Sequence, residues 1–266
     1  MPKVSVIMGV MNAASRIDES IKSIIEQTFT DWEFIICDDG SIDNTYSKLL
    51  EWQKKDKRII PIKNEKNIGL AATLNHCIRY CNGKYIARMD DDDFSYPSRF
   101  QKQVDFLDDN TEYAFVSSSC KIFDGKKVYE PKKLSIEKPK KEDFLWSSRF
   151  IHPATMFRTQ ALKEANGYRE AKETIKSQDY DLFMRLYSKG MIGYNIQEPL
   201  LCYYVNPAVK RKKLKYKFRI NESIIRYKGF KAMGILLPKG IPYIFKPLIV
   251  GFIPVNILEL AKRKYN

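Results

Sequence analysis

The sequence predicts an α/β fold with a mostly parallel central sheet flanked by helices. Apolar runs of strand length alternate with stretches in which apolar residues recur every three or four positions, and short connections join them. Polar and acidic motifs follow the apolar runs. In a parallel sheet wound by right-handed crossovers, such positions share one edge, where ligands bind. The 266 residues, 44% of them hydrophobic and 29% charged, suffice for one large globular domain.

The first ninety residues carry the clearest alternation. Strands are predicted at residues 4–10, 33–37, 59–62 and 85–87, and helices at residues 15–27, at residues 44–55 and from the turn at 64–69 to residue 81. The first helix is amphipathic, with Ile17, Ile21, Ile24 and Ile25 on one face. This pattern is typical of a helix packed against a sheet.

The later elements are less regular. A helix is predicted to begin near Pro97, and another covers residues 180–188 before Lys189 and Gly190, which end it. Residues 123–141 are rich in Lys and Pro and contain a turn sequence at 124–127, which predicts a hairpin followed by an exposed loop.

Four consecutive carboxylates, at residues 90–93, follow the predicted strand 85–87. Like charges this close repel one another unless a cation or several donors neutralise them. Oxygen ligands at a strand end suit a hard divalent ion such as Mg²⁺ or Mn²⁺, which keeps positions open for the phosphates of a nucleotide. The alternative is a solvated acidic turn that caps the helix near Pro97.

A series of motifs in this order resembles the family 2 glycosyltransferases. The motifs lie at residues 4–12, 23–29, 33–45, 67–69, 87–93, 97–100, 152–155 and 178–182. The resemblance covers roughly residues 1–205 and implies the GT-A fold, a nucleotide-sugar donor, a divalent metal and inversion at the anomeric carbon. Two positions depart from it. Met11 stands where the family commonly has an aromatic residue, and Ala13 replaces an acidic residue often found after Asn12.

The resemblance also implies roles for single residues. The nucleotide of the donor would contact Val10, Asn12, Asp38, Asp39, Asn67, Gly69, Arg88, Asp90 and Asp91. Asp92 is the first choice for a direct ligand of Mn²⁺ or Mg²⁺, with Asp90 and His152 as further candidates. His152 matches a family position near the diphosphate, where it would contact phosphate or metal. Asp179 matches the catalytic base, and from the residues alone a helix cap is the alternative for Asp179.

The positive charge of the chain is concentrated after the region of resemblance. The net charge is +14, and residues 209–266 contain 15 Lys and Arg against 2 Asp and Glu, whereas residues 1–208 contain 31 against 30. We therefore expect a GT-A catalytic domain at residues 1–205 and a basic amphipathic extension at residues 206–266.

The extension is expected to lie on an anionic membrane surface. A basic helix is predicted from residue 209, with Leu214, Phe218 and Ile225 as an apolar stripe, whereas Lys246 and Pro247 interrupt the later apolar run, so no membrane-spanning helix is predicted. The alternative is a helical appendage packed on the catalytic domain or on a second subunit, as in a homodimer. Nucleic acid is not an expected partner, because no recognition motif accompanies the charge.

The expected activity is transfer of a sugar, from a UDP-sugar by preference, to a hydroxyl of a saccharide acceptor linked to a lipid, in bacterial surface polysaccharide synthesis. The lack of a signal peptide and of a disulfide pattern predicts a cytoplasmic protein on the inner face of the cell membrane. One alternative is a sugar nucleotidyltransferase, although residues 9–16 offer its phosphate loop one Gly and one Arg. Another is a membrane-associated adaptor with a decayed nucleotide site.

Overall fold

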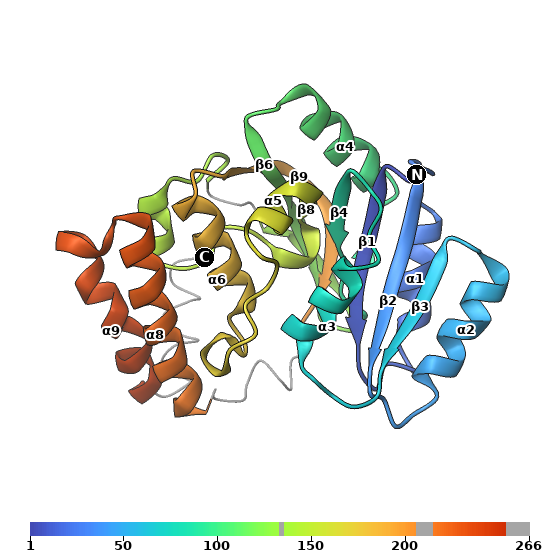
Figure 1. Ribbon diagram of the computed structural model, residues 1–266, viewed down its shortest axis with the longest axis horizontal. Coiled ribbons are helices and arrows are strands. Elements are labelled where there is room, and N and C mark those ends of the chain that lie inside the picture. Colours follow the sequence, from blue (N-terminus) through green and yellow to red (C-terminus); the bar gives the residue numbers. More distant parts are fainter. Residues whose placement is uncertain (133–135, 206–214, 254–266) are drawn as a thin grey trace.

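The computed structural model describes residues 1–132, 136–205 and 215–253 (Figure 1). Within these residues the sheet has nine strands in the order β3-β2-β1-β4-β8-β6-β9-β5, and β7 pairs with β6 outside this path. The strands are β1 (Val4–Val10), β2 (Trp32–Asp39), β3 (Ile59–Asn64), β4 (Tyr85–Arg88), β5 (Phe94–Ser95), β6 (Tyr113–Phe123), β7 (Val128–Lys132), β8 (Met156–Arg158) and β9 (Ile192–Tyr204).

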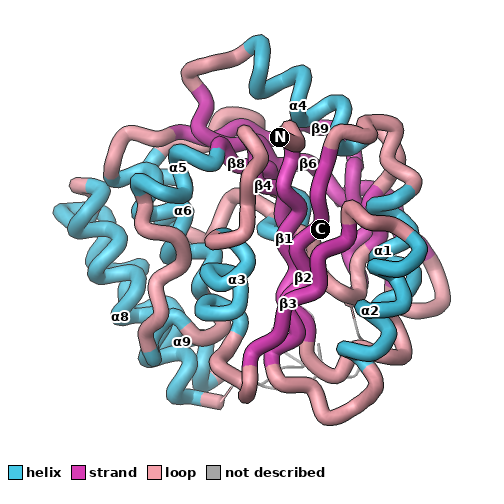
Figure 2. The backbone as a smooth tube through the Cα atoms, turned by 45° about the vertical axis from the view of Figure 1, so that its right-hand side comes forward, coloured by secondary structure: helices cyan, strands magenta, loops and turns pink. Residues whose placement is uncertain are grey.

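The helices lie on both sides of the sheet (Figure 2). The α-helices are α1 (Ile17–Ile25), α2 (Thr45–Lys55), α3 (Leu70–Ile78), α4 (Arg99–Asp109), α5 (Thr159–Glu164), α6 (Gln178–Ser188), α8 (Tyr216–Met233) and α9 (Ile241–Phe252). Short helical turns are η1 (Lys141–Leu145), η2 (His152–Ala154), η3 (Lys172–Thr174) and η4 (Leu236–Gly240).

The sheet is parallel from β3 to β4 and mixed beyond. β1 pairs in parallel with both β2 and β4, and β2 pairs in parallel with β3. β8 then runs antiparallel between β4 and β6, and β9 is parallel to β6. In the parallel half, Val10 is level with Asp38, and Asp39 is level with Asn64. The register therefore brings the predicted donor-site residues to one edge, as expected for parallel strands.

Two apolar cores form, one on each face of the sheet. The alternating side chains of β1 divide between them: Val6 and Met8 pack with α1 and α4, whereas Ile7 packs with α3 and α6. The predicted face of α1 is confirmed, because Ile17, Ile21 and Ile24 are fully buried and Ile25 packs at the edge of the same core. This packing holds the strand ends rigidly relative to one another.

The predicted elements are confirmed with small shifts of their ends. α3 ends at Ile78, earlier than expected, because the N–H groups of residues 79–81 turn back to His76, Cys77 and Ile78 carbonyls. The hairpin of β6 and β7 is present, whereas residues 133–135 of the predicted loop lie outside the described residues.

The extension packs on the α/β body through one face of α8. Ile225, Phe230 and Met233 are buried in the same apolar core as Phe183 of α6. This face of α8 therefore packs on the body, which was the alternative to membrane binding. Ile225, predicted as part of the apolar stripe, is one of the residues that pack there. Residues 209–214 of the predicted basic helix, with Leu214, lie outside the described residues. The division of the chain at residue 205 stays a prediction.

Within the residues that the structure describes, no helix has both the length and the apolar character needed to cross a membrane.

Candidate active site

The first group of predicted residues lies at the carboxyl ends of β1 and β2. Val10 is buried at the end of β1, and Asn12 follows in a left-handed conformation with φ of +50°. The N–H of Asn12 donates to Ser41 Oγ at 2.9 Å, and its Oδ1 accepts from the N–H of Ile42 at 3.0 Å. Asn12 thus fixes the loop between β2 and α2, which forms one wall of the site.

Asp39 organises the loop that carries Asn67. Its Oδ1 accepts hydrogen bonds from Asn64 Nδ2 and the N–H of Ile68, both at 2.9 Å, and its Oδ2 accepts from the N–H of Gly69 at 3.0 Å. Hydrogen bonds to an ionised acceptor are stronger than neutral ones. The Asp39 carboxylate is therefore largely committed to positioning Asn67 and Gly69, and a contact between Asp39 and a base stays a prediction.

Asp38 has a carboxylate oxygen that lacks a protein partner. The side chain is fully buried, and its Oδ1 accepts from the N–H of Ser41 at 3.1 Å, whereas Oδ2 has no hydrogen-bond partner among the described residues. An unpaired buried acceptor is costly unless a ligand or water satisfies it. Met11, at the position of the missing aromatic ring, is 41% exposed and its sulfur contacts Asn67 Nδ2.

The acidic run lies in a loop that is tied down at both ends. At its start, Arg99 donates to the carbonyl of Arg88 at 2.8 Å, and the Arg88 guanidinium pairs with Asp90. At its end, the buried Asp93 accepts from the N–H of Tyr204 at 2.8 Å. Arg88 is itself fully buried, and its Nε and Nη1 have no partner in the described part of the chain. The structure thus places Arg88 beneath the loop, where it supports Asp90.

Asp92 is the most exposed residue of the acidic run, although its carboxyl group is partly shielded from water. Burial of its carboxyl group, together with the charges of Asp91 and Asp90, raises the pKa of Asp92 to about 6, although Arg16 opposes the shift. Arg16 reaches across from the loop after β1 and pairs with Asp91 at 2.7 Å. None of the four carboxylates caps α4, whose N-cap is Ser98 and whose first turn has no acidic residue. The capping alternative for the acidic run is therefore wrong.

The residues present fit a divalent ion that is shared with a diphosphate. Asp92 and Asp90 offer hard oxygen ligands, and a cation would relieve the repulsion that raises the pKa of Asp92. The described residues contain no group of three or more His, Cys, Asp or Glu placed to hold a metal by themselves. The remaining ligands would therefore come from the nucleotide and from water.

His152 is held inside the protein. It is buried in η2, its Nε2 lies 2.7 Å from the Tyr168 hydroxyl, and burial together with the Arg88 guanidinium lowers the pKa of His152 well below its ordinary value. A neutral imidazole beside Arg88 favours a supporting role. A contact of His152 with metal or phosphate stays a prediction.

Asp179 lies in the first turn of α6 and opens into a pocket of about 210 Å³. Ser177 is the N-cap residue of α6, and Asp179 lies in the first turn, where backbone N–H groups approach its carboxylate, so a role in stabilising the helix end stays open for Asp179 beside a catalytic one. Burial raises the pKa of Asp179, and Asp90 adds to the shift, whereas backbone N–H groups and Arg88 oppose it. The pocket is lined by Ser147, Ser148, Lys176, Ser177, Asp179, Tyr180, Glu222 and Arg226. A carboxyl group with a raised pKa beside an open pocket is suited to accept a proton.

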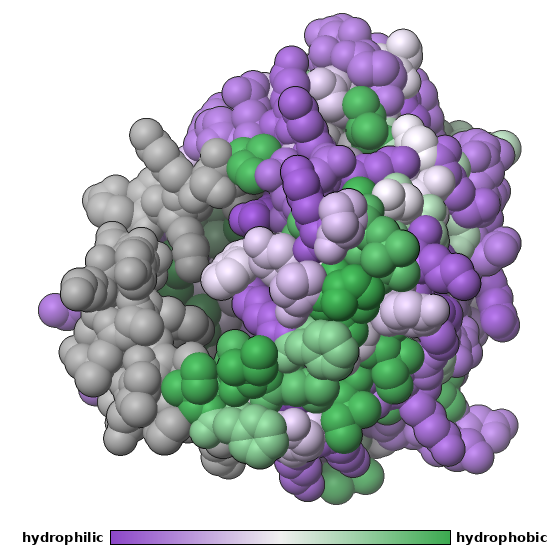
Figure 3. All heavy atoms as spheres, turned by 90° about the vertical axis from the view of Figure 1, so that its left-hand side faces the viewer, coloured by the Kyte–Doolittle hydropathy of each residue, from purple (hydrophilic) through white to green (hydrophobic). Residues whose placement is uncertain are grey.

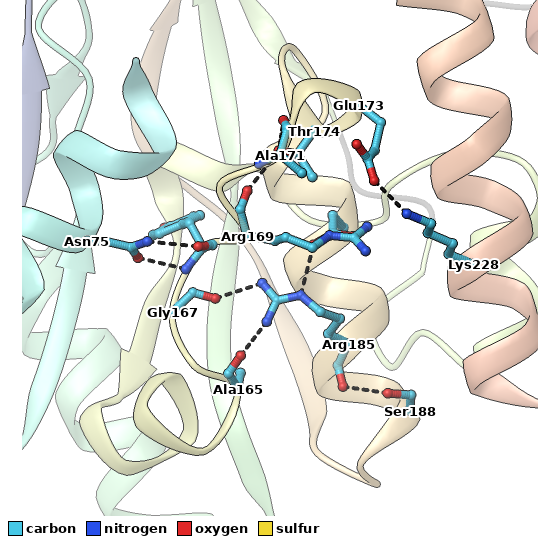
Figure 4. A network of polar contacts seen from close by, with 12 residues as sticks. Asn75, Ala165, Gly167, Arg169, Ala171, Glu173, Thr174, Arg185, Ser188 and Lys228 are labelled. Atoms are coloured by element: carbon cyan, nitrogen blue, oxygen red, sulfur yellow. Dashed lines mark hydrogen bonds and ion pairs between the residues drawn. The ribbon is translucent and has the colours of Figure 1, made fainter. Parts of the chain in front are cut away.

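A polar network fixes the base of α6 (Figure 4). Arg185 donates to Asp181 at 2.8 Å, to the carbonyl of Gly167 at 2.7 Å and to the carbonyl of Ala165. Asn75 of α3 exchanges two hydrogen bonds of 2.8 Å with the backbone of Tyr168. The network therefore couples α6, and with it Asp179, to the parallel half of the sheet.

Two further residues belong to this site. Arg16 is the ion-pair partner of Asp91. Tyr203 is near the end of β9, and its pKa is raised first by burial and then by the charges of Asp90, Asp93, Asp92 and Asp179. Next to Asp92, a pocket of about 1080 Å³ has several aromatic side chains in its lining: Phe94, Tyr96, Phe123, Tyr203 and Tyr204. In the sequence, the tyrosines at the end of β9 are the feature that could have indicated Tyr203 as a site residue. The approach of Tyr203 to the acidic loop, however, depends on the pairing of β9 with β5.

The chain is similar to known proteins over most of its length. Residues 5–165 match the model of the family described as glycosyl transferase family 2. The glycosyltransferase EpsE of Bacillus subtilis is 37% identical over 267 residues, which cover 99% of this chain and 94% of EpsE. A β-1,3-galactosyltransferase of Escherichia coli, named for UDP-Gal and α-D-GlcNAc-diphosphoundecaprenol, is 28% identical and covers 99% of this chain and 96% of its own.

Solved structures share the fold. TarS of S. aureus in complex with UDP-GlcNAc has a TM-score of 0.71 at 17% identity, and the match covers 92% of this chain and 73% of TarS. The mannosyltransferase PcManGT of Pyrobaculum calidifontis, in complex with GDP-Man and Mn²⁺, has a TM-score of 0.60 at 19% identity and covers 99% of this chain and 80% of its own. The sheet, the strand-end site and these likenesses define a GT-A α/β protein. The chain belongs to glycosyl transferase family 2.

Proposed function

We propose that this protein is an inverting, metal-dependent hexosyltransferase that moves a sugar from a UDP-sugar to a hydroxyl of a lipid-linked saccharide. The acceptor oxygen attacks the anomeric carbon as the bond to the diphosphate breaks, UDP leaves, and the hydroxyl proton passes to Asp179. A single displacement of this kind inverts the anomeric centre and needs one base.

The observation that carries the proposal is the environment of Asp179. Its carboxyl group lines a pocket, its pKa is raised by burial, and it feels the charge of Asp90 in the acidic loop. In this proposal Asp90 and Asp92 hold the donor diphosphate, and the electrostatic interaction of Asp90 with Asp179 supports a base and a leaving group that lie near each other. Mn²⁺ or Mg²⁺, held by Asp92 and Asp90, would supply charge stabilisation for the departing diphosphate.

The identity of donor and acceptor is inferred from relatives. The galactosyltransferase from E. coli is named for UDP-Gal and a diphosphoundecaprenol-linked GlcNAc, and TarS was solved with UDP-GlcNAc. TarS supports the fold alone at its low identity. The match to the galactosyltransferase covers almost the whole chain. We therefore infer the same class of donor and acceptor for this protein. These substrates would place it in bacterial surface polysaccharide synthesis, at the cytoplasmic face of the membrane.

The two alternatives from the sequence receive less support. A sugar nucleotidyltransferase would need a phosphate-binding loop after β1, whereas here Asn12 and Arg16 engage Ser41 and Asp91. An adaptor that had lost its nucleotide site would not need an exposed Asp92 or a pocket around Asp179.

The donor site is tested by calorimetric titration of the full chain with UDP, GDP, CDP and dTDP, each with Mn²⁺, Mg²⁺ or EDTA. We expect metal-dependent binding of UDP that is lost in Asp92→Asn. The control is Asp109→Asn, an exposed carboxylate at the end of α4, which should bind as the native protein does. Absence of binding with every nucleotide and metal would contradict the proposal.

The acceptor is tested by incubation of each UDP-sugar with a polyprenyl-diphosphate-linked monosaccharide and with the same free monosaccharide. We expect UDP release and a new glycosidic bond with the lipid-linked acceptor, and nuclear magnetic resonance of the product should show the anomeric configuration opposite to that of the donor. A product with retained configuration would refute the single displacement by Asp179.

A further inference from the structure

The outward side of α9 is entirely apolar. Its exposed residues share one side of the helix at spacings of three and four: Ile241 (38% exposed), Pro242, Phe245 (52%), Ile249 (61%) and Phe252 (74%). No charged residue is among the exposed residues of α9. Contiguous exposed apolar surface of this kind marks a binding surface.

α8 continues this surface. Tyr216, Ile220, Ile224 and Tyr227 lie on one side of α8 and are each between 39% and 46% exposed. The two helices run side by side, since the rings of Tyr216 and Phe252 are 5.2 Å apart and Arg226 approaches the carbonyl of Tyr243. Figure 3, which faces this side of the molecule, shows apolar side chains gathered in a band. We call the eight large residues Tyr216, Ile220, Ile224, Tyr227, Ile241, Phe245, Ile249 and Phe252 the apolar face.

Positive charge surrounds the apolar face. Residues 216–252 contain seven Lys and Arg and one acidic residue, Glu222. Lys217, Lys231 and Lys239 are exposed, and Lys231 projects from the same side of α8 as Ile224. If a second copy docked face to face, it would bring these like charges together. An anionic lipid surface complements them, and long lysine side chains reach headgroups while apolar neighbours enter the acyl boundary.

The dimensions favour a helix pair lying in the surface of the bilayer. α9 has 12 residues, a length of about 18 Å, and contains Pro247. A spanning helix needs about 20 apolar residues. The opposite side of α8 is buried against the body through Ile225 and Phe230, so α8 can offer only its outer side to lipid. An amphipathic element of this form binds in the interface plane.

We infer that the apolar face of α8 and α9 docks the protein on an anionic lipid bilayer. The inner side of α8 contributes Glu222 and Arg226 to the pocket of Asp179. Docking therefore brings the wall of that pocket close to the membrane, where a lipid-linked acceptor resides; this last step rests on the proposed function, whereas the docking itself does not. A docked enzyme meets its acceptor at a raised effective concentration.

The test is co-sedimentation of the full chain with vesicles of phosphatidylcholine alone or mixed with phosphatidylglycerol, without substrates. We expect binding to the mixed vesicles and a partition coefficient that falls at least about tenfold in the double variant Phe245→Ser/Ile249→Ser. Lys231→Gln and Lys239→Gln should each weaken binding about fivefold and reduce its dependence on salt. Leu50→Ser and Lys54→Gln, at exposed positions on α2, are the matched controls and should bind as the native chain does.

The outcomes separate docking from its alternatives. Light scattering and thermal unfolding of each variant run alongside, so that a misfolded variant is recognised and replaced by the milder Ile249→Thr. Equal sedimentation of the native chain and the double variant would overturn the inference, as would a native dimer that the double variant converts to a monomer without any change in vesicle binding. No substrate is present in the vesicle experiment, so a negative result there would not bear on the test of sugar transfer.

Discussion

At the scale of single residues, the site depends on how each carboxylate is paired. Asp39 accepts hydrogen bonds from the N–H groups of Ile68 and Gly69, Asp93 holds the end of β9, and Asp90 pairs with the buried Arg88. Asp92 and Asp179 each line a pocket, and burial raises the pKa of each. In the proposed mechanism Asp179 accepts the proton and Asp92, together with Asp90, holds the metal, while Asp39 and Asp93 fix the surrounding loops.

The first prediction concerns Asp179. Asp179→Asn should lower kcat by a factor of about 10²–10⁴, because the amide cannot accept the proton, while metal-dependent UDP binding stays unchanged. Steady-state rates and calorimetry on the same preparations check this. Asp109→Asn is the control for loss of a carboxylate elsewhere, and an equal loss of UDP affinity in Asp179→Asn would argue for a donor-binding role instead.

The second prediction is the pH dependence that follows from Asp179. The active form of Asp179 is the carboxylate, so the rate should rise as the pH increases through the pKa of Asp179. Because burial raises this pKa, the rise should lie above the value of about 3.9 for an ordinary Asp. We call this rise the acid limb of the profile. The groups that face Asp179 are Arg88, Asp90, Tyr168, Lys176, Tyr180, Tyr203, Glu222 and Arg226. A profile of kcat/KM against pH should show the limb in the native chain and lose it in Asp179→Asn. An unchanged limb would assign it to another group.

The third prediction concerns Gly40, in the turn after β2. Its φ is +71°, and a Cβ there would lie 2.7 Å from the backbone N of Asn67. Gly40→Ala should destabilise the protein beyond the cost of about 1–2 kcal/mol expected for a left-handed residue, and should weaken UDP binding because the Asn67 loop must move. The matched control is Gly190→Ala, where φ is +80° and the added Cβ meets nothing within 4 Å. If the two variants lost the same free energy of unfolding in urea, the steric contact of a Cβ at residue 40 would be excluded as a cause.

At the scale of elements, α8 links the extension to the pocket of Asp179. Arg226 is 2% exposed and donates to the carbonyls of Leu145 at 2.7 Å and Trp146 at 3.0 Å, while pairing with Glu222 at 2.9 Å. On the outer side, Lys228 pairs with Glu173 of η3 at 2.5 Å. One helix thus joins η1, η3 and the wall of the pocket.

The fourth prediction tests this link. Arg226→Met keeps the length of the side chain but removes the donor to the buried Leu145 carbonyl, while the Trp146 carbonyl keeps Lys246 and Glu222 keeps Arg219 as a partner. The free energy of unfolding should therefore fall by about 2–3 kcal/mol. Lys228→Met removes an exposed pair and should cost about 0–1 kcal/mol. Urea unfolding of both variants measures the difference. Similar losses in the two would show that Arg226 does not hold α8 in place.

At the scale of the whole molecule, the body and the extension share a core. Ile225 and Phe230 of α8 lie in one cluster with Phe183 of α6 and Phe157 of β8. Helices that share a core with a sheet unfold with it. The basic extension is therefore continuous with the body in its packing, although it differs from the body in charge.

The fifth prediction is a single cooperative unfolding transition. Trp146 reports on the extension, because Lys246 lies 3.5 Å over its ring, whereas Trp32 is buried in β2 and reports on the sheet. Fluorescence of variants that retain only Trp146 or only Trp32 should give the same urea midpoint as far-ultraviolet circular dichroism. An earlier transition for Trp146 alone would show that the extension is a separate unit.

Local patterns predicted much of the fold. The period of the apolar residues placed β1, α1, β2 and α2 within a few residues, since burial against a sheet demands that period. The two-residue β5 and the long β9 were not predicted, because strands of this kind are defined by their partners and not by their own sequence. For the same reason Tyr203 and Arg16 were missed as members of the site.

The sequence by itself determined the family, the parallel half of the sheet and the acidic loop after β4, because these depend on residue order and on periods of two and 3.6. The tertiary structure decided which carboxylates are occupied by protein donors and which line pockets. Asp39 is bound to the loop of Gly69 and Asp93 to β9, whereas Asp92 and Asp179 each line a pocket. It also decided that α8 buries one side and exposes the other. Hydrogen-bond partners and burial arise between segments distant in the chain, and no local pattern contains them.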